Sequence, residues 1–143
     1  MAWTIIPTIV EQSKNYLKWR LQCKNDANAL SATDILSETY MPRDMKPKIQ
    51  GLTMMRMKID PSGPDASSLS TTIDVTLSDS EGDALYASTG NSASAISWHD
   101  LSADIGAYPT ILERLYLTVN DLGEAGVEEF YLYFICWKES GRI

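Results

Sequence analysis

Three acidic side chains, Asp79, Glu81 and Asp83, alternate within five residues of the sequence and are the first candidates for chemistry. Carboxylates at this spacing can bind calcium, because a loop with oxygen ligands at alternate positions can wrap around the ion. An EF-hand loop that begins at Asp79 would need glycine at its sixth position and glutamate at its twelfth. The chain has Ala84 and Gly90 there, so the EF-hand pattern fails twice.

The same segment also has the composition of a tight turn between two strands. Runs of alternating apolar residues lie on both sides of residues 79–82. Gly82 can adopt a positive φ, and the Asp79 carboxylate can accept a hydrogen bond from the backbone amide two residues later. We predict a β-hairpin turn here, and no metal or cofactor, with a looser calcium site as the alternative.

His99, in the segment "SWHD", is the only histidine of the chain. A catalytic triad of nucleophile, histidine and acid would need it as the base. The sequence has no G-x-S-x-G motif to mark a nucleophile elbow, and no glycine-rich phosphate loop. A lone histidine beside Trp98 and Asp100 is more often structural, so we predict no catalytic residue and no enzyme activity. A carboxylate pair of the glycosidase type is the alternative that the sequence leaves open.

The two cysteines, Cys23 and Cys136, lie in apolar runs and do not have the spacing of a zinc site. We predict buried free thiols in a protein that is synthesised in a reducing cytoplasm. The first residues lack the features of a signal peptide, and no apolar run approaches the ~20 residues of a transmembrane helix. We therefore expect no membrane partner.

The chain has 143 residues, of which 44% are hydrophobic and 22% charged, and a net charge of −7. This length and composition predict one globular domain over residues 1–143. The negative charge argues against a nucleic-acid partner, because neutralising phosphates requires clustered Lys and Arg.

The apolar residues that could form the core mostly alternate with polar ones, which is the pattern of half-buried strands. We expect inward positions in three of these runs: Leu17, Trp19, Leu21 and Cys23; Ile73, Val75 and Leu77; and Leu115, Leu117 and Val119. With seven or eight short strands, the predicted fold is all-β, an antiparallel β-sandwich or jelly roll. One short helix at most is expected, near residues 31–38, with Ser31 as its N-cap.

The run 50–60 also alternates, with Met54, Arg56 and Lys58 on one face and Met55 on the other. Pro7 cannot donate to a sheet ladder, so the first strand is expected at a sheet edge.

The last predicted strand, "FYLYFICW", is apolar or aromatic on both faces. In a two-layer sandwich one face of a sheet normally contacts water. The second face is therefore covered either by a loop of the same chain, such as 25–48 or 89–109, or by another protein, because Tyr and Trp are enriched at interfaces. We predict that a neighbouring chain contacts part of the following set: Trp3, Met54, Arg56, Tyr131, Tyr133 and Trp137.

The order of these segments resembles that of a group of small virion proteins of tailed bacteriophages. Those proteins share a segment of the form YDITLTD-x-x-G-x-D-h-LGG and a terminal pair of strands joined by a turn rich in Asn and Gly. The matching residues here are 73–79, followed by Gly82 and Asp83, and the matching pair is "RLYLTVNDLGEAGVEEFYLYF". The resemblance spans residues 15–137, but after Leu85 the chain reads "YASTGN" in place of the glycine-rich continuation.

This resemblance implies a non-enzymatic β-sandwich protein of the virion. The expected role is that of a capsid cement or decoration protein, which binds and stabilises the shell and whose partner is the major capsid protein. A homo-oligomer, dimer or trimer, and a location on the capsid surface are expected with it. The alternative is a tail, neck or baseplate component, or a receptor- or glycan-binding module of the virion.

Overall fold

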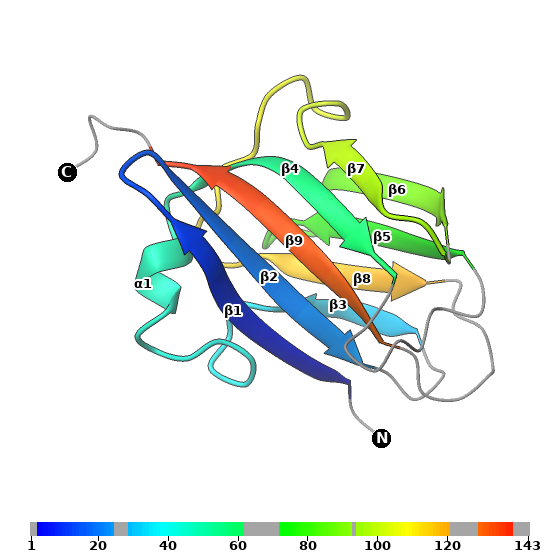
Figure 1. The fold of residues 1–143 in the computed structure, drawn as a ribbon, viewed down its shortest axis with the longest axis horizontal. Coiled ribbons are helices and arrows are strands. Elements are labelled where there is room, and N and C mark those ends of the chain that lie inside the picture. The colour runs from blue at the N-terminus through cyan, green and yellow to red at the C-terminus, as the bar shows by residue number, and fades with distance from the viewer. Residues whose placement is uncertain (1–2, 25–28, 62–71, 93, 121–128, 139–143) are drawn as a thin grey trace.

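The computed structural model describes residues 3–24, 29–61, 72–92, 94–120 and 129–138, which form two antiparallel β-sheets packed face to face (Figure 1). The five-stranded sheet has the order β1 (Thr4–Gln12), β2 (Tyr16–Lys24), β9 (Glu129–Trp137), β4 (Thr53–Asp60) and β7 (Ser97–Asp100). The four-stranded sheet has the order β3 (Leu30–Asp34), β8 (Tyr116–Asn120), β5 (Ile73–Ser78) and β6 (Ala84–Asn91). The predicted all-β sandwich is confirmed.

The core lies between the two sheets and contains the residues that the alternation placed inward. All the predicted inward residues of the three runs are at most 1% exposed. On the five-stranded sheet, the Trp19 and Phe134 rings stack with their centroids 4.7 Å apart. The predicted strand phases are therefore correct for β2, β5 and β8, and the thiols of Cys23 and Cys136 are buried and free.

Strand β1 forms one edge of the five-stranded sheet, as Pro7 predicted. Its pairing with β2 shifts between Ile9 and Glu11, which marks a bulge. Proline and a bulge both interrupt the row of backbone donors, so they protect this edge from pairing with another chain.

The helix predicted near residues 31–38 is wrong. Leu30 pairs with Val119 as part of β3, and turns follow this strand. The helix of the described residues is α1 (Lys46–Ile49), with Pro47 in its first turn, where a missing backbone N–H costs nothing. The Asp34 carboxylate accepts hydrogen bonds from the Leu36 and Leu115 amides and so joins the turn to the four-stranded sheet.

The predicted phase of residues 50–60 is wrong at Met54. A bulge between Met54 and Arg56 adds one residue to β4, so Met54 points into the core with 0% exposure while Arg56 and Lys58 stay on the outer face. A one-residue insertion reverses the side-chain alternation on one side of it, because successive strand residues point to opposite faces.

Three segments that the sequence predicts as a strand, a loop and a turn either differ in extent from the structure or cannot be compared with it. The strand expected at 110–121 begins only at Tyr116, and Thr110 forms an isolated bridge with Thr53. The loop at 61–68, apart from its first residue, and the turn "LGEAG" lie outside the described residues. Within the described ranges, no helix has the length and hydropathy needed to cross a bilayer.

Candidate protein-docking surface

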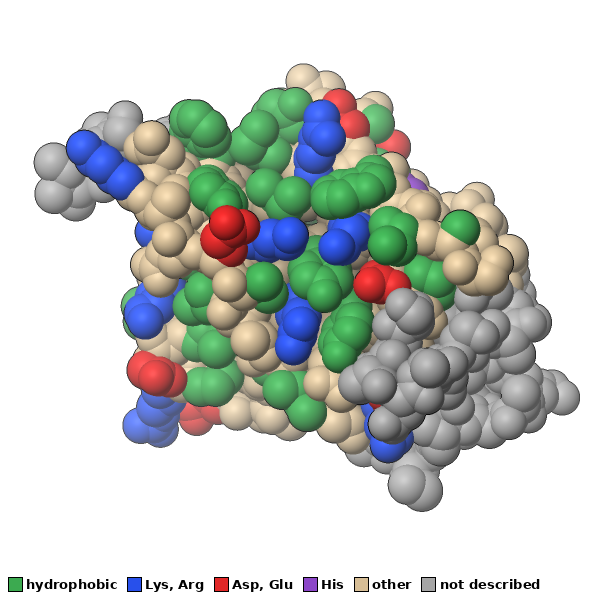
Figure 2. Space-filling model, viewed as in Figure 1, with side chains coloured by type: hydrophobic (Ala, Val, Ile, Leu, Met, Phe, Trp, Pro, Cys, Tyr) green, Lys and Arg blue, Asp and Glu red, His purple; other side chains and the backbone are tan. Residues whose placement is uncertain are grey.

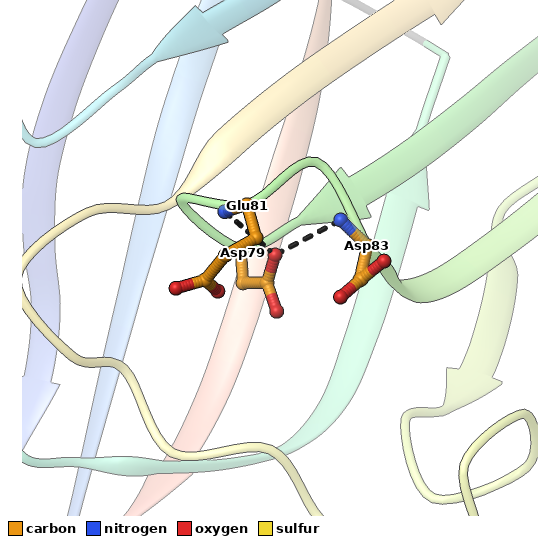
Figure 3. A group of neighbouring side chains, drawn as sticks. All are labelled: Asp79, Glu81 and Asp83. Carbon is orange, nitrogen blue, oxygen red and sulfur yellow. Dashed lines mark hydrogen bonds between the residues drawn. The ribbon is translucent and has the colours of Figure 1, made fainter.

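The acidic segment forms the turn of the β5–β6 hairpin. One carboxylate oxygen of Asp79 accepts hydrogen bonds from the Glu81 amide at 3.0 Å and the Asp83 amide at 2.9 Å (Figure 3). Gly82 has a φ of 87° and donates its amide to the Asp79 carbonyl. These contacts are the turn chemistry that the sequence predicted, and they account for the spacing of the acids.

The turn also brings three carboxylates together. Asp79, Glu81 and Asp83 each offer an oxygen within 4.8 Å of the others. A pocket of about 640 Å³ adjoins the turn and is lined by Asp79, Glu81 and apolar side chains that include Leu85 and Leu112. Because the hydrogen bonds of the turn already require this arrangement, the proximity of the carboxylates does not by itself point to a metal ion.

His99 lies half-buried in β7 between two hydroxyl groups. Its Nδ1 is 2.8 Å from the Tyr86 hydroxyl of β6, and its Nε2 is 3.1 Å from the Ser97 hydroxyl. Burial lowers the pKa of His99, so the ring is neutral at pH 7. In a Ser-His-Asp triad, one ring nitrogen of the histidine faces the nucleophile and the other faces a carboxylate. In His99 the nitrogen opposite the Ser97 hydroxyl faces the hydroxyl of Tyr86 and not a carboxylate. The contacts join the edge strands of the two sheets, which fits a structural role.

The outer face of the five-stranded sheet carries the aromatic side chains of β9 and β7. We call this surface the aromatic face and define it by nine of the residues that point away from the core on four adjacent strands: Lys18, Arg20, Arg56, Lys58, Trp98, Tyr131, Tyr133, Ile135 and Trp137. Figure 2 shows hydrophobic and basic side chains intermingled on this face. Trp98 and Trp137 are 53% and 47% exposed.

Basic side chains lie over the aromatic rings of this face. Lys58 Nζ is 4.0 Å from the centroid of Tyr133 and 5.4 Å from that of Trp98. Arg20 Cζ is 4.7 Å from the centroid of Tyr131, and Lys18 Nζ is 5.4 Å from that of Tyr133. Each contact is worth about 0.5–1 kcal/mol at an exposed site, so together they hold the side chains in a defined arrangement.

The predicted interface residues separate into two groups. Arg56, Tyr131, Tyr133 and Trp137 lie on the aromatic face. Trp3 and Met54 are 8% and 0% exposed, so these two members of the set lie in the core and not on the aromatic face.

Trp3 packs its ring edge-to-face against Phe130 with a centroid distance of 6.0 Å, which accounts for its burial. The strands within the two proposed covering segments, β3 and β7, belong to the sheets and do not form a layer over the aromatic face. Residues 30–34 pair into the four-stranded sheet, and 97–100 extend the five-stranded sheet as β7.

Five residues of the face were missing from the predicted interface: Lys18, Arg20, Lys58, Trp98 and Ile135. Lys18 and Arg20 lie on the polar face of the alternating run 15–24, and Lys58 was predicted to share a face with Met54 and Arg56. The signal for their role is that both strands pair with β9. Trp98 lies in the mainly loop-like segment 89–109, where the sequence predicts one short strand around residues 96–98, and β7 covers Ser97–Asp100.

Comparison of the chain with known protein families, with curated proteins and with solved structures finds no match. The function is therefore inferred from the residues of this chain and their arrangement.

Proposed function

We propose that the protein is a non-enzymatic structural protein of a tailed-bacteriophage virion, a capsid cement protein that docks on the major capsid protein through its aromatic face. The observation that carries the docking role is the exposure of Trp98 and Trp137 beside Tyr131 and Tyr133 on the outer face of one sheet. The virion role is supported by the resemblance of residues 15–137 to small virion proteins.

The area of the face favours a partner. An aromatic side chain offers about 150–250 Å² of surface, and soluble monomers rarely expose contiguous apolar patches above a few hundred Å². Ile135 continues the row of Tyr131 and Tyr133 along β9, and Trp137 ends it. Tyr, Trp and Arg are the side chains that most often carry binding energy at protein interfaces.

The chemistry of the other candidate sites supports a binding role over catalysis. His99 contacts two hydroxyls, and the carboxylates of the acidic turn are placed by backbone hydrogen bonds. A cement protein acts by adding buried area between neighbouring shell subunits, and many copies multiply a modest affinity.

The test is decoration of expanded capsids that lack the protein. Wild-type protein should bind them and appear on the capsid surface in an electron-microscopy map. Tyr133→Ala and Trp137→Ala should each reduce bound protein by at least tenfold, while Leu112→Ala, a change at an exposed apolar residue away from the face, should bind normally. Density at the tail, neck or baseplate, or normal decoration by both variants, would contradict the proposal.

A further inference from the structure

We propose that the aromatic face binds an acidic protein surface, whose carboxylates pair with Arg20 and Lys58 on either side of Tyr133. This inference rests on the proposed docking function and adds the chemistry of the partner to it. It starts from the register of the three central strands.

Basic residues flank the aromatic row of β9 at two successive outward positions. Tyr133 pairs with Arg20 on β2 and with Lys58 on β4. Ile135, the next outward residue, pairs with Lys18 on β2 and with Arg56 on β4 in the same way. Directly opposed side chains on neighbouring strands lie about 4.5–5.5 Å apart at Cβ, so cations border the apolar row on both sides.

The key cations keep hydrogen-bonding capacity for a partner. Among the described residues, the ion pairs join Lys24 to Glu129 and Arg43 to Glu38, and neither Arg20 nor Lys58 takes part in them. The Nε atom of Arg20 is buried and has no hydrogen-bond partner, so a docking protein can contact only the terminal N–H groups of this guanidinium. A guanidinium group held over a ring still directs its outer N–H groups to solvent, where a carboxylate can accept them in pairs.

The positions of the cations also discriminate between kinds of partner. Sugars and nucleobases bind aromatic side chains by stacking on a free ring face. Here Lys18 and Lys58 approach the ring of Tyr133 from the strands on both sides, and Arg20 lies over Tyr131. Rings covered by cations can instead offer their edges and hydroxyls to a protein surface.

The charge distribution of the chain agrees with an acidic partner. The net charge is −7, yet basic side chains border the centre of this face. Acids border this centre on both sides: Asp60 on β4 and Asp100 on β7 lie on one side, and Glu11 on β1, opposite Lys18, lies on the other. Because the rest of the molecule is acidic, an acidic partner is attracted to the basic side chains beside β9 and repelled from the other surfaces. The charge distribution therefore favours the orientation in which the partner's acids contact this face.

The experiment titrates the protein with poly-L-glutamate at low salt and follows the fluorescence of the exposed tryptophans. Wild-type protein should bind, and affinity should fall steeply as salt is added. The double variant Arg20→Gln/Lys58→Gln should bind at least tenfold more weakly. The matched control Arg43→Gln/Lys48→Gln removes the same charge at exposed positions outside the face, and should weaken binding less than about twofold, the effect of net charge alone.

Parallel titrations with heparin and with oligo-dT separate an acidic protein from other polyanions. Tighter binding of either polymer than of poly-L-glutamate would overturn the inference, as would an equal loss in the two double variants or no binding of poly-L-glutamate. If Tyr133→Ala fails to decorate capsids but the wild-type protein does not bind poly-L-glutamate, the docking function stands and only the inference of an acidic partner is overturned. If the wild-type protein binds poly-L-glutamate but Tyr133→Ala and Trp137→Ala both decorate capsids normally, the proposed docking function is contradicted instead.

Discussion

At the scale of single residues, Gly82 is the position where backbone conformation alone sets the cost of a substitution. Its φ is 87°, and a Cβ atom there would meet nothing within 4 Å. Gly82→Val should therefore lower the free energy of unfolding by roughly 1–2 kcal/mol through strain. Gly82→Asn should lose less, because Asn tolerates a positive φ.

Chemical denaturation of both variants checks this prediction. The loss for Gly82→Val should be equal in calcium and in EDTA, because the turn depends on hydrogen bonds to Asp79. Calorimetry of the wild type should detect no calcium binding tighter than roughly millimolar, the range of weak extracellular modules. A micromolar site that disappears in Glu81→Gln would show that the acidic turn binds a metal.

His99 should produce a step in the pH dependence of stability. Burial lowers its pKa in the folded protein below the value of about 6.5 in the unfolded chain. Above that value both states are neutral, and as the pH falls below it the unfolded chain takes up the proton first. The free energy of unfolding should therefore fall as the pH drops from 7 toward 5.

The step belongs to one residue, because His99 is the only histidine. The nearest polar groups are the hydroxyls of Tyr86 and Ser97, which the neutral ring can satisfy with one donor and one acceptor. Urea unfolding at a series of pH values should show the decline in the wild type and a flatter profile in His99→Gln. An unchanged profile in that variant would assign the decline to carboxylates.

At the scale of secondary-structure elements, the inward residues of β9 should determine stability and its outward residues should determine binding. Phe134 is 0% exposed and stacks on Trp19, so Phe134→Ala should lower the free energy of unfolding by about 3–5 kcal/mol. Tyr133, the preceding residue, points outward, and Tyr133→Ala should cost about 1 kcal/mol for its lost contacts with Lys18 and Lys58.

Thermal unfolding of the two variants measures this difference directly. Similar losses for both would mean that the outer face of β9 is covered in solution. The contrast matters for function, because a variant such as Tyr133→Ala can report on docking only if the folded protein remains intact.

At the scale of the whole molecule, the two thiols should report global unfolding. Cys23 and Cys136 lie in neighbouring central strands, and Cys136 Sγ accepts a hydrogen bond from Trp19 Nε1 at 3.3 Å. Burial raises the pKa of both thiols, that of Cys136 to about 12, and only the thiolate reacts. Labelling in native buffer should therefore proceed only when the sandwich opens.

The measurement compares labelling rates over a range of denaturant. Ser80→Cys, in the exposed β5–β6 turn, provides the control and should react within seconds in native buffer. Fast labelling of the wild-type thiols without denaturant would show that the edge of the sandwich opens locally.

The alternation of apolar and polar residues was sufficient to predict the sandwich and much of its core. Leu77 and Leu117 pair across β5 and β8 with the predicted faces buried. Side chains alternate between the two faces of a strand, so only one phase buries all the apolar residues of an alternating run. The acidic turn was predictable for a similar reason: Asp79 and Gly82 act on their own neighbours along the chain.

Tertiary structure decided what depends on contacts between distant segments. The bulge that turns Met54 inward follows from the pairing of β4 with β9, which lies about 80 positions away in the sequence. The residues at the bulge include no glycine or other local sequence signal that would predict it. The burial of Trp3 depends on Phe130 in the same way. The pairing of β2 and β4 on either side of β9 likewise assembled the aromatic face, because only strand order brings Arg20 and Lys58 to the same tyrosine.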